Sequence, residues 1–199
     1  MADDKSGREK QARDADRRQR ERDIAEERER GDEPEPPVEA DAVDELVSTM
    51  DPQTFPATGA DVVAAIGDRE IDAVDGTYTV EELVPDTDAE TFDSPAAVRM
   101  RVQRPTIAAA MKRVLEASRE IPNAEVSESQ RDAYEKTFRE LKAIDADDDD
   151  EGVTAISNWI VEESRENGKL PGSRAVRRQA AAFCRTNGYE IRNDEWLGV

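Results

Sequence analysis

Apolar residues are nearly absent from the first 30 residues of the chain. Ile24 is the only large aliphatic side chain there after Met1. No apolar stripe can hold this stretch against a core, so we predict a charged arm that is disordered or transiently helical. Three of residues 34–37 are proline, which cannot continue a helix. Residues 1–37 are therefore predicted to form this arm and an extended linker.

Residues 38–121 alternate short apolar runs with helix-start signals. Thr58 is followed three residues later by an acid, as in a capping box, and Ser94 precedes a proline that suits the first turn of a helix. An Asp-Gly dipeptide at 75–76, between alternating residues, predicts a β-hairpin. We expect one domain of helices and a hairpin, with helices at about 42–50, 60–66, 80–84, 96–104 and 106–120.

Residues 122–199 carry large apolar side chains at helical spacing. Tyr134, Phe138 and Leu141 mark one helix, a second should end at Gly168, and a third should begin at a Ser173 cap. We expect a three-helix unit, with residues 189–199 packing on it as a lid. The predicted fold is mainly α with one small β-hairpin, in two small helical units behind the arm.

Charge dominates the composition. The chain has 48 acidic and 28 basic side chains, a net charge of -20, and 22 of its basic residues are arginine. Such acidity is typical of proteins from extreme halophilic archaea, where concentrated salt screens the repulsion between carboxylates. The acidity itself therefore does not indicate a partner. Segments that are not acidic are the better guide to a binding surface.

Several kinds of chemistry are poorly provided for. The sequence has no histidine, so the commonest general base and the commonest zinc ligand are both missing. Cys184 is the one cysteine, and we expect a buried, inert thiol because no histidine can activate it. The acidic run at 145–151 fails the calcium-loop pattern, because Asp150 and Ile156 stand where glycine and glutamate are needed. We expect no catalytic residues, metal or cofactor.

No address or membrane segment is evident. The first residues are charged, without the apolar core of a secretory signal, and the longest apolar runs have five residues where a membrane span needs about twenty. We therefore expect a cytoplasmic protein without a membrane partner.

One predicted helix, at 174–186, is rich in arginine. At 100° per residue, Arg174, Arg178 and Arg185 fall on one side, while Val176, Ala180 and Phe183 fall on the opposite side. Arginine suits phosphate and guanine because its planar guanidinium donates two parallel hydrogen bonds. The candidate contact residues for nucleic acid or a protein partner are Arg174, Arg177, Arg178 and Arg185. The competing interpretation is a surface paired with nearby carboxylates.

A second basic cluster lies beside Pro105. It comprises Arg99, Arg101, Arg104 and Arg113. Cations at the end of a helix interact favourably with its dipole, which gives part of this cluster a structural reason.

Residues 1–103 resemble an uncharacterised small-domain family of haloarchaea. The resemblance rests on the charged arm, the proline-rich linker and the segments 55–58, 67–71 and 90–94. The pattern is not followed from Pro105 onward. The resemblance implies no activity, cofactor or functional residue.

These observations favour binding over catalysis. The leading hypothesis is a cytoplasmic interaction or adaptor protein, and its protein partners are not identified by the sequence. The alternative is a nucleic-acid-associated regulator that uses the arginines of 174–185, and an enzyme ranks third. Arginines on one open face would favour nucleic acid, whereas arginines locked to carboxylates of the preceding helix would favour the adaptor.

Overall fold

The computed structural model describes residues 38–122, 126–144 and 150–190. The predictions for the arm and linker at 1–37, for residues 145–149 of the acidic run and for most of the C-terminal tail lie outside the described residues. Within them the chain is mainly α-helical with a small hairpin, which confirms the predicted fold class.

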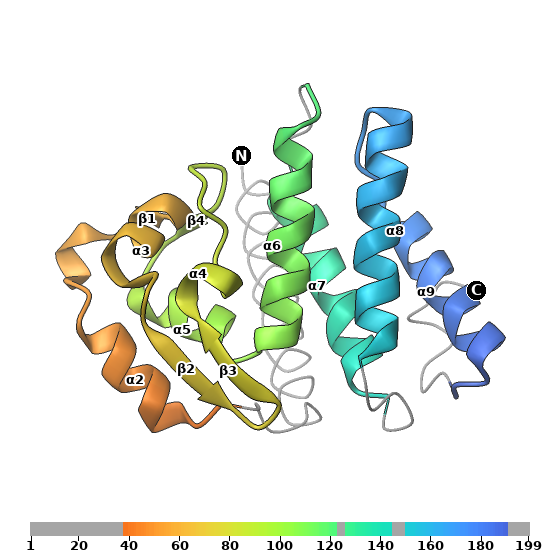
Figure 1. The fold of residues 1–199 in the computed structure, drawn as a ribbon. Coiled ribbons are helices and arrows are strands. Elements are labelled where there is room, and N and C mark those ends of the chain that lie inside the picture. The colour runs from red at the N-terminus through yellow and green to blue at the C-terminus, as the bar shows by residue number, and fades with distance from the viewer. Residues whose placement is uncertain (1–37, 123–125, 145–149, 191–199) are drawn as a thin grey trace, which may run out of the picture. The chain divides into compact units, whose positions relative to one another are not determined.

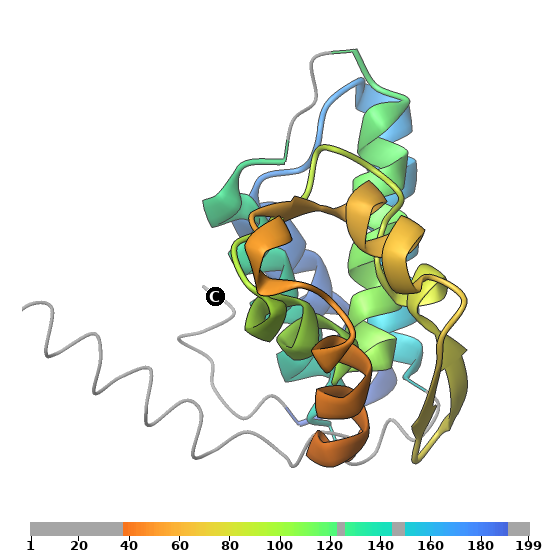
Figure 2. The ribbon, with the colours of Figure 1, turned by 90° about the vertical axis from the view of Figure 1, so that its left-hand side faces the viewer.

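The first part of the described chain is built from short elements (Figure 1). They are α2 (Ala40–Ser48), a 3-10 turn (Pro52–Thr54), β1 (Ala57–Thr58), α3 (Gly59–Ile66), β2 (Glu70–Ala73), β3 (Gly76–Thr79), α4 (Val80–Leu83), β4 (Thr91–Phe92) and α5 (Pro95–Val102). Figure 2 looks onto α2, which packs on α5. Each predicted helix is found within two residues of its expected limits.

Local capping fixes where these helices begin. The Thr58 hydroxyl accepts from the backbone N–H of Asp61 at 3.1 Å, and the Asp61 carboxylate accepts from the Thr58 N–H at 2.9 Å. Both bonds satisfy N–H groups that a helix start leaves free. Ser94 caps α5 in the same way through the N–H of Ala97 at 3.3 Å.

The hairpin pairs β2 with β3 in antiparallel register, and Ala73 lies opposite Gly76. Its two-residue loop is therefore Val74-Asp75, so the Asp-Gly dipeptide lies one residue later than the centre of the turn. Gly76 has a φ of 152°, a conformation that side chains other than hydrogen rarely allow.

A second small sheet was not predicted. β1 and β4 pair antiparallel through two residues each, Ala57 with Phe92 and Thr58 with Thr91. The pairing brings the 85–90 loop against α3, where the Gly59 N–H donates to the Glu90 carbonyl at 2.9 Å. A Cβ at Gly59 would lie 2.2 Å from the Pro85 carbonyl oxygen, so this approach requires glycine.

Four long helices form the rest of the described chain. They are α6 (Pro105–Arg119), α7 (Glu128–Lys142), α8 (Glu151–Asn167) and α9 (Ser173–Asn187). α6 runs beside α8, and α9 lies beyond α8 on the side away from the hairpin (Figure 1). The three helices expected after residue 122 are present, and α6 packs with them.

Two hydrophobic clusters form the core. One gathers α2 to α5 and the hairpin around residues such as Val62, Leu83 and Val98. The other gathers α6 to α9 around residues such as Met111, Phe138 and Ile160. α6 contributes Ala108 to the first cluster and Met111 to the second. A domain boundary at 121–122 remains a prediction, and α6 joins both clusters.

Two predicted caps were wrong in detail. The Ser127 hydroxyl caps α7, but the Gln130 side chain turns away and donates to Tyr134 at 2.8 Å and to the Pro171 carbonyl at 3.0 Å. α9 begins at Ser173 itself, with Gly172 as its N-cap and no side-chain cap. The Gln130 amide bonds instead to Tyr134 in the same helix and to Pro171, a partner distant in sequence that a local capping rule does not include.

Candidate nucleic-acid interface

Three of the four predicted contact arginines lie on the exposed side of α9. Arg174, Arg178 and Arg185 are all exposed, and their positions fall within about 40° around the helix axis. At 1.5 Å per residue, this arginine column extends about 16 Å along α9. The sequence-based grouping of these three residues matches their exposure in the structure.

Arg177 differs from the other three. The buried residues of α9 are Val176, Ala180, Ala181 and Cys184, and their directions surround that of Arg177. Arg177 is accordingly half-buried, and its Nε is shielded without an acceptor among the described residues. Val176 and Ala180 of the expected buried stripe are buried, but the stripe also takes in Ala181 and Cys184 and is therefore rotated toward Arg177.

The packing of α9 explains why its buried stripe is rotated around the helix axis relative to the prediction. The buried stripe includes Ala181 and Cys184, because α9 packs on both α7 and α8. Phe183, expected in the buried stripe, is half-buried, with its ring centroid 6.0 Å from that of Tyr189. Cys184 is buried, as predicted.

Arginines elsewhere in the helices are held by partners. From α5 to α8 the pairs are Arg99 with Asp44, Arg101 and Arg131 with Glu90, Arg113 with Asn158, Arg119 with the Asp86 carbonyl, and Arg165 with Glu120. Arg104 and Arg139 also have partners. Each arginine of the cluster beside Pro105 thus has a specific structural partner. The helix dipole, which was predicted to explain part of the cluster, is not needed to account for it.

The arginines of α9 stand apart from this pattern. Among the described residues, no hydrogen bond or ion pair is found for the guanidinium groups of Arg174, Arg177, Arg178 or Arg185. The helix itself, Ser173–Asn187, contains no carboxylate. α9 therefore presents uncompensated positive charge in a chain whose net charge is -20.

Sequence reasoning missed the neighbouring column of α9. Ala175 and Thr186 are exposed, and Gln179 and Ala182 are half-buried. Their spacings of three, four and seven residues place them side by side next to the arginine column. The same helical periodicity that grouped the arginines could have identified this column. It was not predicted because its residues carry no charge.

The helices around α9 support its exposed position. α7, α8 and α9 each pack on the other two. The turn between α8 and α9 begins at Gly168, whose φ of 63° ends α8 in the left-handed conformation.

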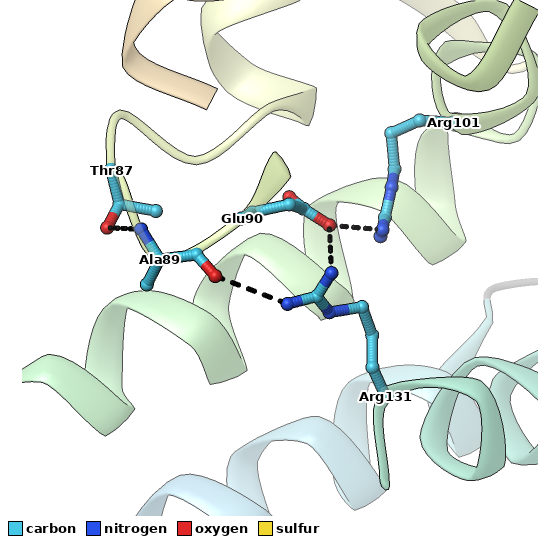
Figure 3. A network of polar contacts seen from close by, with 5 residues as sticks. All are labelled: Thr87, Ala89, Glu90, Arg101 and Arg131. Atoms are coloured by element: carbon cyan, nitrogen blue, oxygen red, sulfur yellow. Dashed lines mark hydrogen bonds and ion pairs between the residues drawn. The ribbon is translucent and has the colours of Figure 1, made fainter. Parts of the chain in front are cut away.

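A buried ion cluster joins the 85–90 loop to α5 and α7 (Figure 3). The side chain of Glu90 is 1% exposed, and its Oε1 lies 2.5 Å from Nη2 of Arg101, which is 9% exposed. Nη1 of Arg131 lies 3.9 Å from the same oxygen, and Nη2 donates to the Ala89 carbonyl at 3.3 Å. The cluster holds two cations and one anion, and Glu90 Oε2 has no hydrogen-bond partner among the described residues.

A cavity of about 390 Å³ lies between the hairpin, α6 and α8. The Thr106 hydroxyl is 3.3 Å from Oδ2 of Asp75 and 3.2 Å from Oδ2 of Asp150. Asp150 also receives the Lys142 ammonium at 2.6 Å. Burial and the nearby carboxylates, Asp75 first among them, raise the pKa of the Tyr78 phenol.

The described residues contain neither a metal-binding cluster nor a membrane-spanning helix. Across residues 38–122, 126–144 and 150–190, no group of three histidine, cysteine or acidic side chains is placed to hold a metal ion. In the same residues, no helix combines the length and apolar composition needed to cross a membrane.

Comparison with other proteins adds one relationship. Neither the curated proteins nor the solved structures include a significant match to the chain. Residues 38–114, from the start of α2 into α6, match the model of a family of unknown function, DUF5789. This match overlaps the segments 55–58, 67–71 and 90–94 that carried the resemblance described above, and it ends before α7, α8 and α9.

Proposed function

We propose that this protein is a non-catalytic nucleic-acid-binding protein that contacts phosphate and bases through α9. The observation that carries the proposal is the uncompensated charge of Arg174, Arg178 and Arg185 on one exposed column. Three of the four predicted arginines lie exposed on one side of α9 without a carboxylate partner, while Arg177 is half-buried, and this supports nucleic acid over an adaptor surface paired with its own carboxylates.

The charge contrast within the molecule supports this choice. Eight arginines from α5 to α8 are engaged by partners, so among the helices of the described residues exposed arginines without a hydrogen bond or ion pair are found on α9 alone. An acidic molecule repels nucleic acid over most of its surface, and binding then depends on a local patch. The carboxylate-free helix α9 provides such a patch.

The adaptor hypothesis remains the second candidate, and the experiment described below also tests it. Catalysis ranks third, because a sequence without histidine offers few groups that titrate near neutral pH. We further propose a cytoplasmic protein of a halophilic archaeon, which the net charge of -20 and the excess of arginine over lysine support.

The test measures binding of a short fluorescein-labelled DNA duplex by fluorescence anisotropy. The test variant replaces the three exposed arginines of α9: Arg174→Gln, Arg178→Gln and Arg185→Gln. The control variant removes the same charge from exposed arginines elsewhere in the described chain: Arg69→Gln, Arg119→Gln and Arg165→Gln. Circular dichroism verifies that both variants remain folded.

We expect the wild-type protein to bind and the α9 variant to lose about tenfold or more in affinity. The control variant should bind nearly as well as wild type. Equal losses in the two variants would mean a general charge effect and would overturn the proposal. Absence of binding by wild type, together with a nuclease-resistant protein partner in a pull-down, would establish the adaptor hypothesis instead.

A further inference from the structure

The exposed face of α9 combines two side-chain columns of different character. The arginine column comprises Arg174, Arg178 and Arg185, all exposed, and the adjacent column comprises exposed Ala175 and Thr186 with half-buried Gln179 and Ala182. All four side chains of the second column are uncharged, and Ala175, Ala182 and Thr186 are short, so the backbone of α9 can come close to whatever it binds at these positions. Long arginine side chains then border this low strip along its length.

Such a face fits the major groove of B-form DNA. The groove is about 12 Å wide and admits a helix, whose diameter with side chains is about 10–12 Å. A helix can lie deep in the groove only where its inward side chains are small, as Ala175 and Ala182 are. Arg174 and Arg185 lie near the two ends of α9, about 16 Å apart, where they can reach phosphates.

The middle of the face carries the two side chains best suited to read bases. Arg178 can donate two hydrogen bonds to the O6 and N7 atoms of guanine. Gln179, next in the chain and in the adjacent column, can pair in the same bidentate manner with the N6 and N7 atoms of adenine. The short side chains of the second column leave room for contacts with thymine methyl groups.

The other forms of nucleic acid fit this face less well. Proteins that bind single strands stack bases on aromatic side chains, and in the described part of the chain none of the aromatic side chains is exposed. The major groove of an RNA duplex is too deep and narrow for side chains to read. Among these forms, the major groove of duplex DNA is the one wide enough to admit a helix along its exposed side.

We propose that α9 lies in the major groove of duplex DNA, with Arg178 and Gln179 at base edges and Arg174 and Arg185 on phosphates. This inference rests on the proposed function and specifies its substrate. It also accounts for the small residues beside the arginines, which a general attraction to polyanions does not require.

Bulk added to the small-residue column provides the test. Ala182→Leu keeps the charge and the helix propensity of α9 but fills the strip that would face the bases. The matched control is Ala96→Leu, at an exposed position of α5. Each protein is titrated against three fluorescein-labelled probes of equal length and random sequence: duplex DNA, duplex RNA and single-stranded DNA.

We expect the wild-type protein to prefer duplex DNA by about tenfold or more. Ala182→Leu should remove most of that preference, and Ala96→Leu should leave it intact. If the three probes bind equally and Ala182→Leu changes nothing, the major-groove inference is overturned while nucleic-acid binding stands. If none of the probes binds, the proposed function fails as well.

Base reading is tested separately by selection from a random duplex library. The wild-type protein should enrich a sequence motif containing guanine and adenine. A variant with Arg178→Lys and Gln179→Ala should enrich it weakly or not at all. Failure of the wild-type protein to enrich any motif would overturn the assignment of these two side chains to base edges.

Discussion

Removal of the Glu90 carboxylate should show how strongly the 85–90 loop is held against α5 and α7. Glu90→Gln preserves the size of the side chain but leaves Arg101 and Arg131 without a counter-charge. Glu90 and Arg101 are both at least nine-tenths buried, and their charged atoms lie 2.5 Å apart. Loss of one partner from such a pair costs about 3–5 kcal/mol, because the other charge stays buried and uncompensated.

The other contacts of the cluster predict which substitutions should lower the free energy of unfolding most. Arg131 is 19% exposed and lies 3.9 Å from Glu90, so Arg131→Met should cost only about 1 kcal/mol. Arg101→Met should cost about as much as Glu90→Gln. The double variant with both changes should cost less than the sum of the singles by about 2 kcal/mol, because it removes the pair together.

Urea unfolding followed by circular dichroism measures these differences in a helical protein. Arg99→Met serves as the control, because the Arg99–Asp44 pair is similar in length at 2.8 Å but much more exposed. Its loss should cost less than about 1 kcal/mol. A cost below about 1 kcal/mol for Glu90→Gln, or additive costs in the double variant, would refute the view that this cluster is a tightly coupled buried pair.

Two further predictions concern packing and ionisation. Gly59→Ala should lower the free energy of unfolding by about 2 kcal/mol or more, because its Cβ would meet the Pro85 carbonyl oxygen at 2.2 Å. Gly172→Ala adds a Cβ in open space but at the N-cap of α9, where alanine is less favourable than glycine, so it should cost less than about 1 kcal/mol in the same urea titration. Burial raises the pKa of Tyr134 to about 12, so its contribution to stability should be complete below about pH 10 and be lost as the pH rises toward 12. Tyr134→Phe should abolish that part of the pH dependence in urea titrations, and an unchanged profile would contradict the assignment.

Local signals predicted much of the first part of the fold. The Thr58–Asp61 box, the Ser94 cap and the proline at the start of α6 each act within a few residues, so the sequence is sufficient to place them. The β1–β4 pair could not be predicted in this way. Its strands have two residues each and are separated by more than 30 positions, too short to give an alternating pattern.

The candidate site was predictable in composition but not in orientation. Helical periodicity grouped Arg174, Arg178 and Arg185 correctly, since that grouping depends only on 3.6 residues per turn. The burial of Arg177 depends on how α9 sits against α7 and α8, which no local pattern specifies. The same holds for Glu90, whose partners come from two helices and which nothing in the sequence separates from 47 other acidic residues.

The salt dependence of DNA binding tests most directly whether α9 neutralises phosphates. The slope of the logarithm of the binding constant against the logarithm of the KCl concentration counts those contacts, at about 0.9 per phosphate. A variant with Arg174→Gln and Arg185→Gln should have a slope shallower than wild type by about 1.8, because two contacts are lost. An unchanged slope in this variant would show that Arg174 and Arg185 do not contact phosphates, which contradicts the placement of α9 on DNA.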